Sequence, residues 1–165
     1  MKGRIGSKAI LGVAVVIGTP LGSYYEGMVP HTYVDPVGIT TGCLGETGKN
    51  AAWINTHSMT ECVQRYSGRL RGVGESLDHC VNADVTPEQA AAMISWADNV
   101  GIGNACSSTL VRLLNAGADA PQWCPQLLRW DKATKLGVTI TLPGLQRRRQ
   151  SELRVCLGDT SEFST

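Results

Sequence analysis

The first 25 residues constrain this chain more than any other segment. Lys2, Arg4 and Lys8 form a basic end, and the run from Ala9 to Tyr25 that follows carries no charged residue. This order is typical of an export signal. The run has only about 17 residues, the lower limit for a membrane-spanning helix, and several glycines dilute its aliphatic side chains. We therefore expect a segment that inserts marginally into a bilayer. A cleaved signal peptide is the alternative, although no A-x-A motif is present.

The six cysteines agree with export. They are widely spaced, without a C-x-x-C pair and without a histidine at zinc-ligand spacing, so we expect neither a metal site nor a cofactor. An even number of cysteines in an oxidising compartment favours three disulfides over buried free thiols. Six cysteines allow fifteen pairings. We expect the sequential set, Cys43–Cys62, Cys80–Cys106 and Cys124–Cys156.

Size and charge exclude several other classes of protein. A length of 165 residues suits one ordinary domain with its own core. A net charge of +1 provides no extended basic surface, so nucleic acid is not an expected partner despite the short run 147–149. With 42% hydrophobic and 18% charged residues, the composition is that of a globular protein.

Local signals predict a small β element followed by several helices. β-branched residues between Tyr33 and Leu44 alternate with glycine and proline and favour a hairpin. Beyond it, capping residues and prolines mark helix starts, and Gly101 and Gly103 mark a helix end. The sum is an α+β fold that is mostly α. The expected helices cover residues 58–79, 89–99, 108–114, 122–130 and 145–157.

Two carboxylates lie on either side of a short connection. Glu26 follows the apolar run, Asp35 lies on a turn nine positions later, and Thr41 comes after it. Glycoside hydrolysis needs such a pair, one acid to protonate the leaving oxygen and one carboxylate to handle water or the cation. Partial burial would keep the pKa of Glu26 high enough to donate a proton, whereas Asp35 would be solvated and ionised. The alternatives are a solvated charge at Glu26 and ordinary turn chemistry at Asp35.

The order of motifs resembles that of the phage-type lysozymes, glycoside hydrolase family 24. The resemblance rests on Glu26, Asp35, Thr41 and Gly45, followed by SWADNVG (95–101), STL (108–110), LLRW (127–130) and GLQRRRQSELRVCL (144–157). It implies a lysozyme-like fold and cleavage of the β-1,4 bond between N-acetylmuramic acid and N-acetylglucosamine in peptidoglycan. It also implies that Glu26 is the general acid, that Asp35 positions water and steadies positive charge, and that Thr41 holds the water.

The same resemblance assigns roles outside the hairpin. An arginine of the last helix is implied to pair with Glu26, and Arg148 occupies that position, although a register slip of one would select a neighbour. Trp96 and Thr109 resemble substrate contacts, with a plain core position as the alternative for Trp96. Asn99 is expected to line the cleft. Cys124 replaces a saccharide-contacting asparagine of the family, so we do not carry that contact over.

The apolar segment beside Glu26 resembles that of the signal-arrest-release endolysins. These are exported by the host translocon, remain tethered and inactive at the inner membrane, and leave the bilayer when it is depolarised. We expect a membrane segment at 1–25, a catalytic domain at 26–165, and a monomer that moves from the periplasmic side of the inner membrane into the periplasm. The alternatives are a lytic transglycosylase acting on the same bond and a non-catalytic, membrane-tethered peptidoglycan-binding protein.

Overall fold

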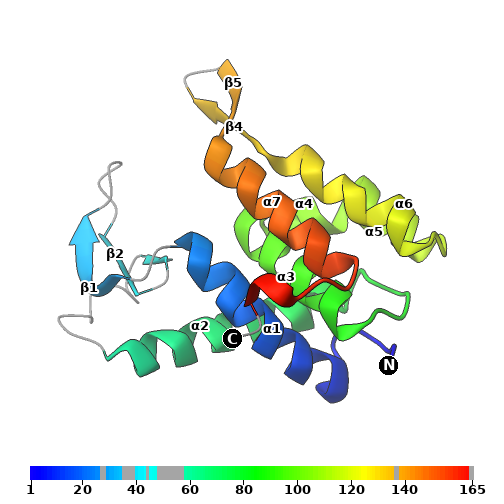
Figure 1. Cartoon of the computed structure of the whole chain (residues 1–165), viewed down its shortest axis with the longest axis horizontal. Helices are drawn as coiled ribbons and strands as arrows, with labels where there is room; N and C mark the ends of the chain where they lie inside the picture. The colour runs from blue at the N-terminus through cyan, green and yellow to red at the C-terminus, as the bar shows by residue number, and fades with distance from the viewer. Residues whose placement is uncertain (27–28, 35–39, 44, 48–57, 136–137, 164–165) are drawn as a thin grey trace.

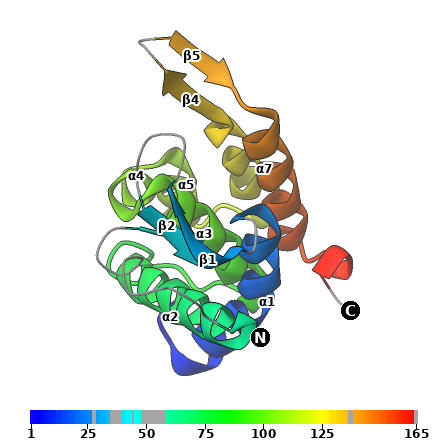
Figure 2. The same ribbon diagram turned by 90° about the vertical axis from the view of Figure 1, so that its left-hand side faces the viewer.

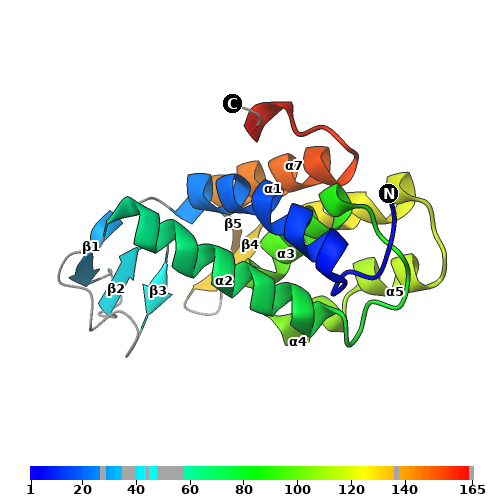
Figure 3. The ribbon, with the colours of Figure 1, turned by 90° about the horizontal axis from the view of Figure 1, so that it is seen from below.

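Helix α3 (Pro87–Val100) lies at the centre of the helical part of the molecule. Helices α1 (Lys8–Glu26) and α2 (Met59–Leu77) pack beside it, and α7 (Pro143–Cys156) covers another side (Figures 1 and 3). This computed structural model describes the chain except for residues 27–28, 35–39, 44, 48–57, 136–137 and 164–165. Shorter helices complete this part: α4 (Ile102–Cys106), α5 (Thr109–Asn115), α6 (Ala120–Trp123), and the 3-10 helices η2 (Cys124–Trp130) and η3 (Ser161–Phe163).

Two small antiparallel sheets flank the helices. The first has the order β1-β2-β3, and Val29 and Tyr33 of β1 pair with Cys43 and Thr41 of β2. The second is a hairpin of β4 and β5 that projects away from the first sheet and leads into α7 (Figure 2). The expected mostly helical α+β fold is confirmed. The strands are β1 (Val29–Val34), β2 (Thr40–Cys43), β3 (Glu46–Thr47), β4 (Lys132–Lys135) and β5 (Val138–Thr141).

Capping interactions explain where the helices begin. Ser58 Oγ accepts a hydrogen bond from Glu61 N, and the Glu61 carboxylate accepts one from Ser58 N, which is the capping box expected from the sequence. Thr86 and Gln89 form the same box before α3, where proline occupies the first turn. Ser108 caps α5 through the amide of Val111. These predicted starts are confirmed because each depends on residues close in sequence.

Three local expectations were incomplete or wrong. Gly101 does end α3, with a φ of 87° that favours glycine, but Gly103 lies inside the short helix α4. The helix expected over 122–130 is split into α6 and η2, since Pro125 has no N–H for an α-helical bond. The hairpin of β4 and β5 was not predicted, and its ladder depends on pairing between strands rather than on a single-strand pattern.

Helix α1 belongs to the main hydrophobic core. Its buried side chains recur at helical spacing, and its glycines permit close approaches: a Cβ at Gly22 would lie 1.6 Å from the hydroxyl of Tyr66. Among the described helices, α1 alone is long and apolar enough to span a bilayer, properties that buried core helices and signal sequences share. The boundary expected between residues 25 and 26 therefore falls at the last residue of a core helix. The buried side chains include Ile10, Leu11, Ala14, Val15 and Leu21.

Three disulfides cross-link the fold, and they join the same pairs as the sequential set. Cys43–Cys62 ties β2 to α2, and Cys80–Cys106 ties the segment after α2 to α4. Cys124–Cys156 ties η2 to the end of α7. Restricting the unfolded chain with loops of these lengths contributes roughly 3 to 4 kcal/mol each to the free energy of unfolding.

Candidate active site

Two of the three expected catalytic residues lie on described elements, α1 and β2, which β1 separates along the chain. Glu26 is the last residue of α1, and Thr41 lies on β2 with 5% of its surface exposed. Cys43, at the end of β2, pairs with Val29 at the start of β1, whereas Thr41 pairs with Tyr33 farther along β1. Asp35 lies outside the described residues. The strand that carries Thr41 therefore lies next to β1, the strand that follows α1 along the chain.

A pocket of about 670 Å³ opens at this end of α1. Tyr24 and Tyr25 line it from α1, Asn99 from the end of α3, and Arg148 from α7. Tyr25 is held in place by its hydroxyl, which lies 2.7 Å from Ser151 Oγ and donates to the carbonyl of Arg147. Asn99 and Arg148, which the resemblance assigned from separate motifs, thus line the same pocket. The rest of the lining is the start of α7: Leu142, Pro143, Gly144, Leu145 and Arg147.

Arg148 is fixed beneath this pocket by a buried polar cluster. Its Nε donates to Glu152 Oε1 at 3.2 Å, and its Nη2 donates to the carbonyl of Ser95 at 3.1 Å. Ser95 Oγ donates to the same Oε1 at 2.8 Å. Arg149 completes the cluster, with Nε 2.7 Å from Glu152 Oε2. Two arginines thus share one glutamate in this cluster, and at most 4% of each of these side chains is exposed.

Burial is the largest influence on the pKa values of Glu152 and Arg149 in this cluster. It raises the pKa of Glu152 above its ordinary value, and the two neighbouring guanidinium groups oppose that shift. Burial also lowers the pKa of Arg149, against the attraction of Glu152. The roles of Ser95 and Glu152 were not predicted from the sequence. The one available signal was the i, i+4 spacing of Arg148 and Glu152 on a helix, which many exposed pairs share.

Trp96 and Thr109 lie in different surroundings. Trp96 is completely buried, so in this structure it occupies the core position that was the alternative to a substrate contact. Its ring contacts that of Trp130 edge to face, with centroids 5.5 Å apart. Thr109 lines a second pocket, of about 340 Å³, between the start of α5 and η2.

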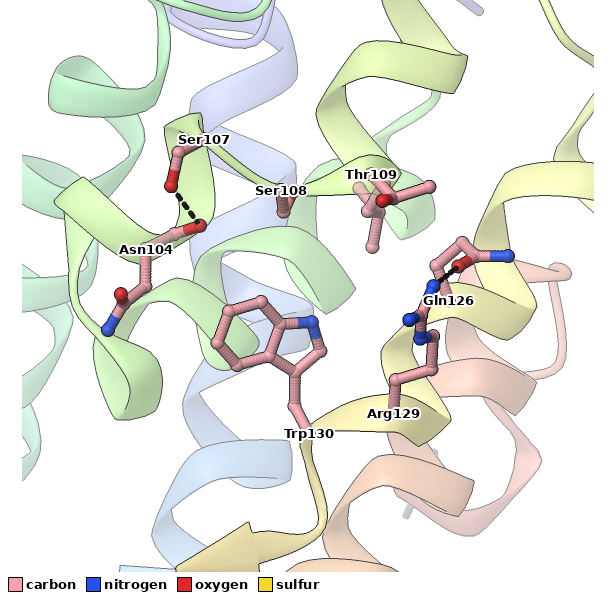
Figure 4. A pocket seen from close by; sticks show the side chains of 8 residues that line it. Asn104, Ser107, Ser108, Thr109, Gln126, Arg129 and Trp130 are labelled. Carbon is pink, nitrogen blue, oxygen red and sulfur yellow. Dashed lines mark hydrogen bonds between the residues drawn. The ribbon is translucent and has the colours of Figure 1, made fainter.

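Polar side chains surround Trp130 in this second pocket. Figure 4 shows its indole between Asn104 and Arg129, and the guanidinium of Arg129 donates to Gln126 Oε1 at 3.2 Å. An indole face beside amide, hydroxyl and guanidinium groups can pack on a sugar ring and hydrogen-bond its substituents. Ser107, Ser108 and Leu110 complete the lining.

Comparison with known proteins decides the family. The family model described as Phage lysozyme matches residues 23–152. The chain belongs to the phage lysozyme family. The chain is 34% identical over 154 residues to the SAR-endolysin of Enterobacteria phage P21. This alignment covers 93% of the chain and 90% of the relative. The chain is 28% identical over 158 residues to the SAR-endolysin of Escherichia phage Mu, covering 90% of this chain and 89% of that relative.

Solved structures agree with the expected lysozyme-like fold. A point mutant of P22 lysozyme superposes with a TM-score of 0.73 at 26% identity, covering 86% of this chain and 95% of that one. The muramidase domain of SpmX from Asticaccaulis excentricus has a TM-score of 0.78 at 24% identity, covering 93% and 97% of the two chains. Membership in the phage lysozyme family and its fold, both expected from the motifs, are therefore confirmed.

Proposed function

We propose that this chain is an endolysin, a peptidoglycan hydrolase that cleaves the β-1,4 bond between N-acetylmuramic acid and N-acetylglucosamine and so lyses the host bacterium. One observation carries the proposal: the chain aligns with a SAR-endolysin across 93% of its length at 34% identity. The family model, which spans the candidate site, supports it as well. Acid–base catalysis by two carboxylates needs no cofactor.

Glu26 protonates the leaving glycosidic oxygen in this mechanism. Asp35, as a carboxylate, positions the attacking water and steadies the positive charge that develops on the sugar, and the hydroxyl of Thr41 holds that water. The position of Glu26 at the end of α1, beside a pocket lined by Tyr24 and Tyr25, supports its role. Arg148, anchored from below, supplies a guanidinium that orients the Glu26 carboxylate.

The glycan is bound by Asn99 in the first pocket and by Thr109 in the second. Their amide and hydroxyl groups suit the hydroxyl and acetamido groups of the sugars. Thr109→Val keeps the shape and removes the hydroxyl. We expect a KM for soluble peptidoglycan fragments that is several-fold higher with nearly unchanged kcat, because uniform binding is lost. An unchanged KM would remove Thr109 from the substrate site.

Catalysis is tested by the loss of turbidity of purified cell walls. Glu26→Gln and Asp35→Asn should each lower the rate by about a hundredfold or more, since each removes acid–base chemistry at nearly constant volume. Glu75→Gln, on the exposed surface of α2, is the matched control and should leave the rate unchanged. Lysis that survives Glu26→Gln would instead favour a non-catalytic binding protein.

Product analysis separates hydrolysis from the other cleavage of the same bond. A muramidase leaves reducing ends, whereas a lytic transglycosylase leaves 1,6-anhydro ends, and the two differ in mass by one water. We expect reducing ends. A product with anhydro ends would assign the chain to the transglycosylases despite Asp35.

Release from the membrane controls this activity. The exported chain is tethered at the periplasmic side of the inner membrane by residues 1–25, which engage the host translocon, and it later leaves the bilayer as a monomer. While α1 spans the membrane, Glu26 is held at the interface and the pocket at the end of α1 is not assembled. Gly12→Leu tests this, because a Cβ at Gly12 meets no atom within 4 Å in the folded protein but the leucine favours the bilayer. We expect delayed lysis with normal activity of the released protein.

A further inference from the structure

The residues before α1 are bound tightly to the body of the protein. Ile5 is completely buried and belongs to the same core cluster as Leu77, Val81 and Val85. It stands between Arg4 and Lys8, outside the uncharged run, so a membrane-spanning segment does not account for it. The start of α1 and the end of α2 lie at the same end of the helical part (Figures 1 and 3). Ile5 thus anchors the residues before α1, the N-terminal tail, where α2 ends.

Asp78, the C-cap of α2, holds the tail on either side of Ile5. Its Oδ1 accepts hydrogen bonds from Arg4 Nε at 3.2 Å and from Gly6 N at 3.1 Å. Its carbonyl oxygen accepts a third from Arg4 Nη2 at 2.7 Å. One acidic residue therefore receives both a guanidinium and a backbone amide of the tail.

A backbone bridge and a glycine complete the contact. Gly3 N donates to Val85 O at 3.0 Å, and Val85 N donates to Gly3 O at 2.9 Å. A Cβ at Gly6 would lie 2.7 Å from Cγ of Asp78, so only glycine permits this approach. We call the set of Gly3, Arg4, Ile5 and Gly6 bound to Asp78 and Val85 the N-terminal clasp.

The topology of a membrane-inserted chain determines whether the clasp can form. Residues 3–6 precede the apolar run, and Asp78 and Val85 follow it. If the run spans the bilayer, the two halves of the clasp lie on opposite sides of the membrane and cannot meet. The clasp forms only after the whole segment, with Arg4, has left the bilayer.

We propose that the site formed by Asp78, Val85 and the cavity filled by Ile5 is a receptor for the chain's own N-terminal tail, which captures the tail after release and prevents α1 from reinserting. This inference rests on the proposed release from the membrane. An ion pair as exposed as Arg4–Asp78, with side chains 42% and 37% exposed, is weak alone. Burial of Ile5 and the hydrogen bonds to backbone groups of the clasp make the capture cooperative.

The test uses the full chain expressed in bacteria and changes only the receptor side. Asp78→Ala leaves the apolar run and its basic end intact, and Glu75→Ala on the same helix is the matched control. After depolarisation with a protonophore, we expect the soluble fraction of Asp78→Ala to fall several-fold below that of wild type and Glu75→Ala. Soluble Asp78→Ala should cleave purified walls within about twofold of wild type, because Asp78 lies at the other end of α1 from the pocket.

A second variant and a direct measurement cover the case in which Asp78→Ala folds poorly. Gly6→Ala places a methyl group against Asp78 and should reduce the soluble fraction in the same way. Hydrogen exchange should show protected amides at Gly3 and Val85 in the released protein and rapid exchange in the bilayer-embedded form. Equal exchange in both forms would overturn the clasp.

Each failure points to a different conclusion. If wild type never associates with the membrane, the proposed release mechanism fails and the clasp is only a structural contact. If wild type moves from membrane to soluble fraction but Asp78→Ala and Gly6→Ala move equally well, release stands and the clasp is refuted.

Discussion

Arg148 and Glu152 form an almost fully buried ion pair, one turn apart on α7, with Nε and Oε1 separated by 3.2 Å. The same carboxylate also receives Arg149 and the hydroxyl of Ser95. Because Arg148 lines the pocket at the end of α1, the position of its guanidinium depends on Glu152, which is not among the residues that line the pocket. Buried charges of this kind are costly to separate.

Replacement of Glu152 should therefore destabilise the protein strongly. Glu152→Ala leaves two buried guanidinium groups without their shared carboxylate, and we expect a loss of about 3–5 kcal/mol in the free energy of unfolding, measured by urea denaturation. The control is Glu162→Ala, which breaks the partly exposed pair of Glu162 with Arg154 and should cost less than about 1 kcal/mol. Similar losses in the two variants would contradict the role of burial.

The close contact between Gly22 and Tyr66 predicts that a larger residue at position 22 destabilises the protein. Gly22→Ala places a methyl group within 1.6 Å of the Tyr66 hydroxyl, and overpacking of this kind costs about 1–3 kcal/mol. Gly12→Ala, on the same helix with no atom within 4 Å of the new Cβ, should be neutral or stabilising by up to about 1 kcal/mol. Melting temperatures of the released protein provide the measurement. Tyr66→Phe should recover only part of the loss, because Cζ of residue 66 still lies 2.6 Å from the new Cβ, and an equal loss with Tyr and Phe would place the strain elsewhere.

The pair Arg154–Glu162 predicts a pH dependence at the C-terminus. The hydrogen bond from Arg154 lowers the pKa of Glu162 below its ordinary value of about 4.5. A carboxyl group whose pKa is lowered by folding stabilises the folded protein at pH values above the pKa it has in the unfolded chain. This contribution is lost as the pH falls through the folded-state pKa. NMR titration should give a Glu162 midpoint below about 4.5 in wild type and a higher one in Arg154→Gln. Because both side chains are partly exposed, the effect on global stability is small.

Disulfides at different places should affect activity differently. Cys43–Cys62 anchors the strand that carries Thr41, whereas Cys80–Cys106 lies beyond the other end of α2. Replacing either pair with serines should lower the free energy of unfolding by about 2–5 kcal/mol. At a temperature where both variants remain folded, only the Cys43/Cys62 variant should lose most of its wall-degrading rate. Equal wall-degrading rates in the two variants would show that catalysis does not depend on the position of the first sheet.

The sequence by itself determined features that depend on neighbouring residues. Ser58 with Glu61 and Thr86 with Pro87 predicted two helix starts, because capping bonds span only three residues. The uncharged run after a basic end predicted a helix able to enter a bilayer. The motif order predicted the family, and hence the lysozyme-like fold, and the assignment of Glu26, Asp35 and Thr41 to catalysis stays a prediction.

Only the tertiary structure decided how distant residues meet. Ser95 and Glu152 share a buried cluster although 57 residues separate them, and Arg4 reaches Asp78 across 74. Burial also separates Trp96, a core residue, from Thr109, which lines a pocket, although one resemblance suggested the same role for both. The physical reason is that burial and charge pairing depend on packing between helices far apart in the chain, which no local pattern encodes.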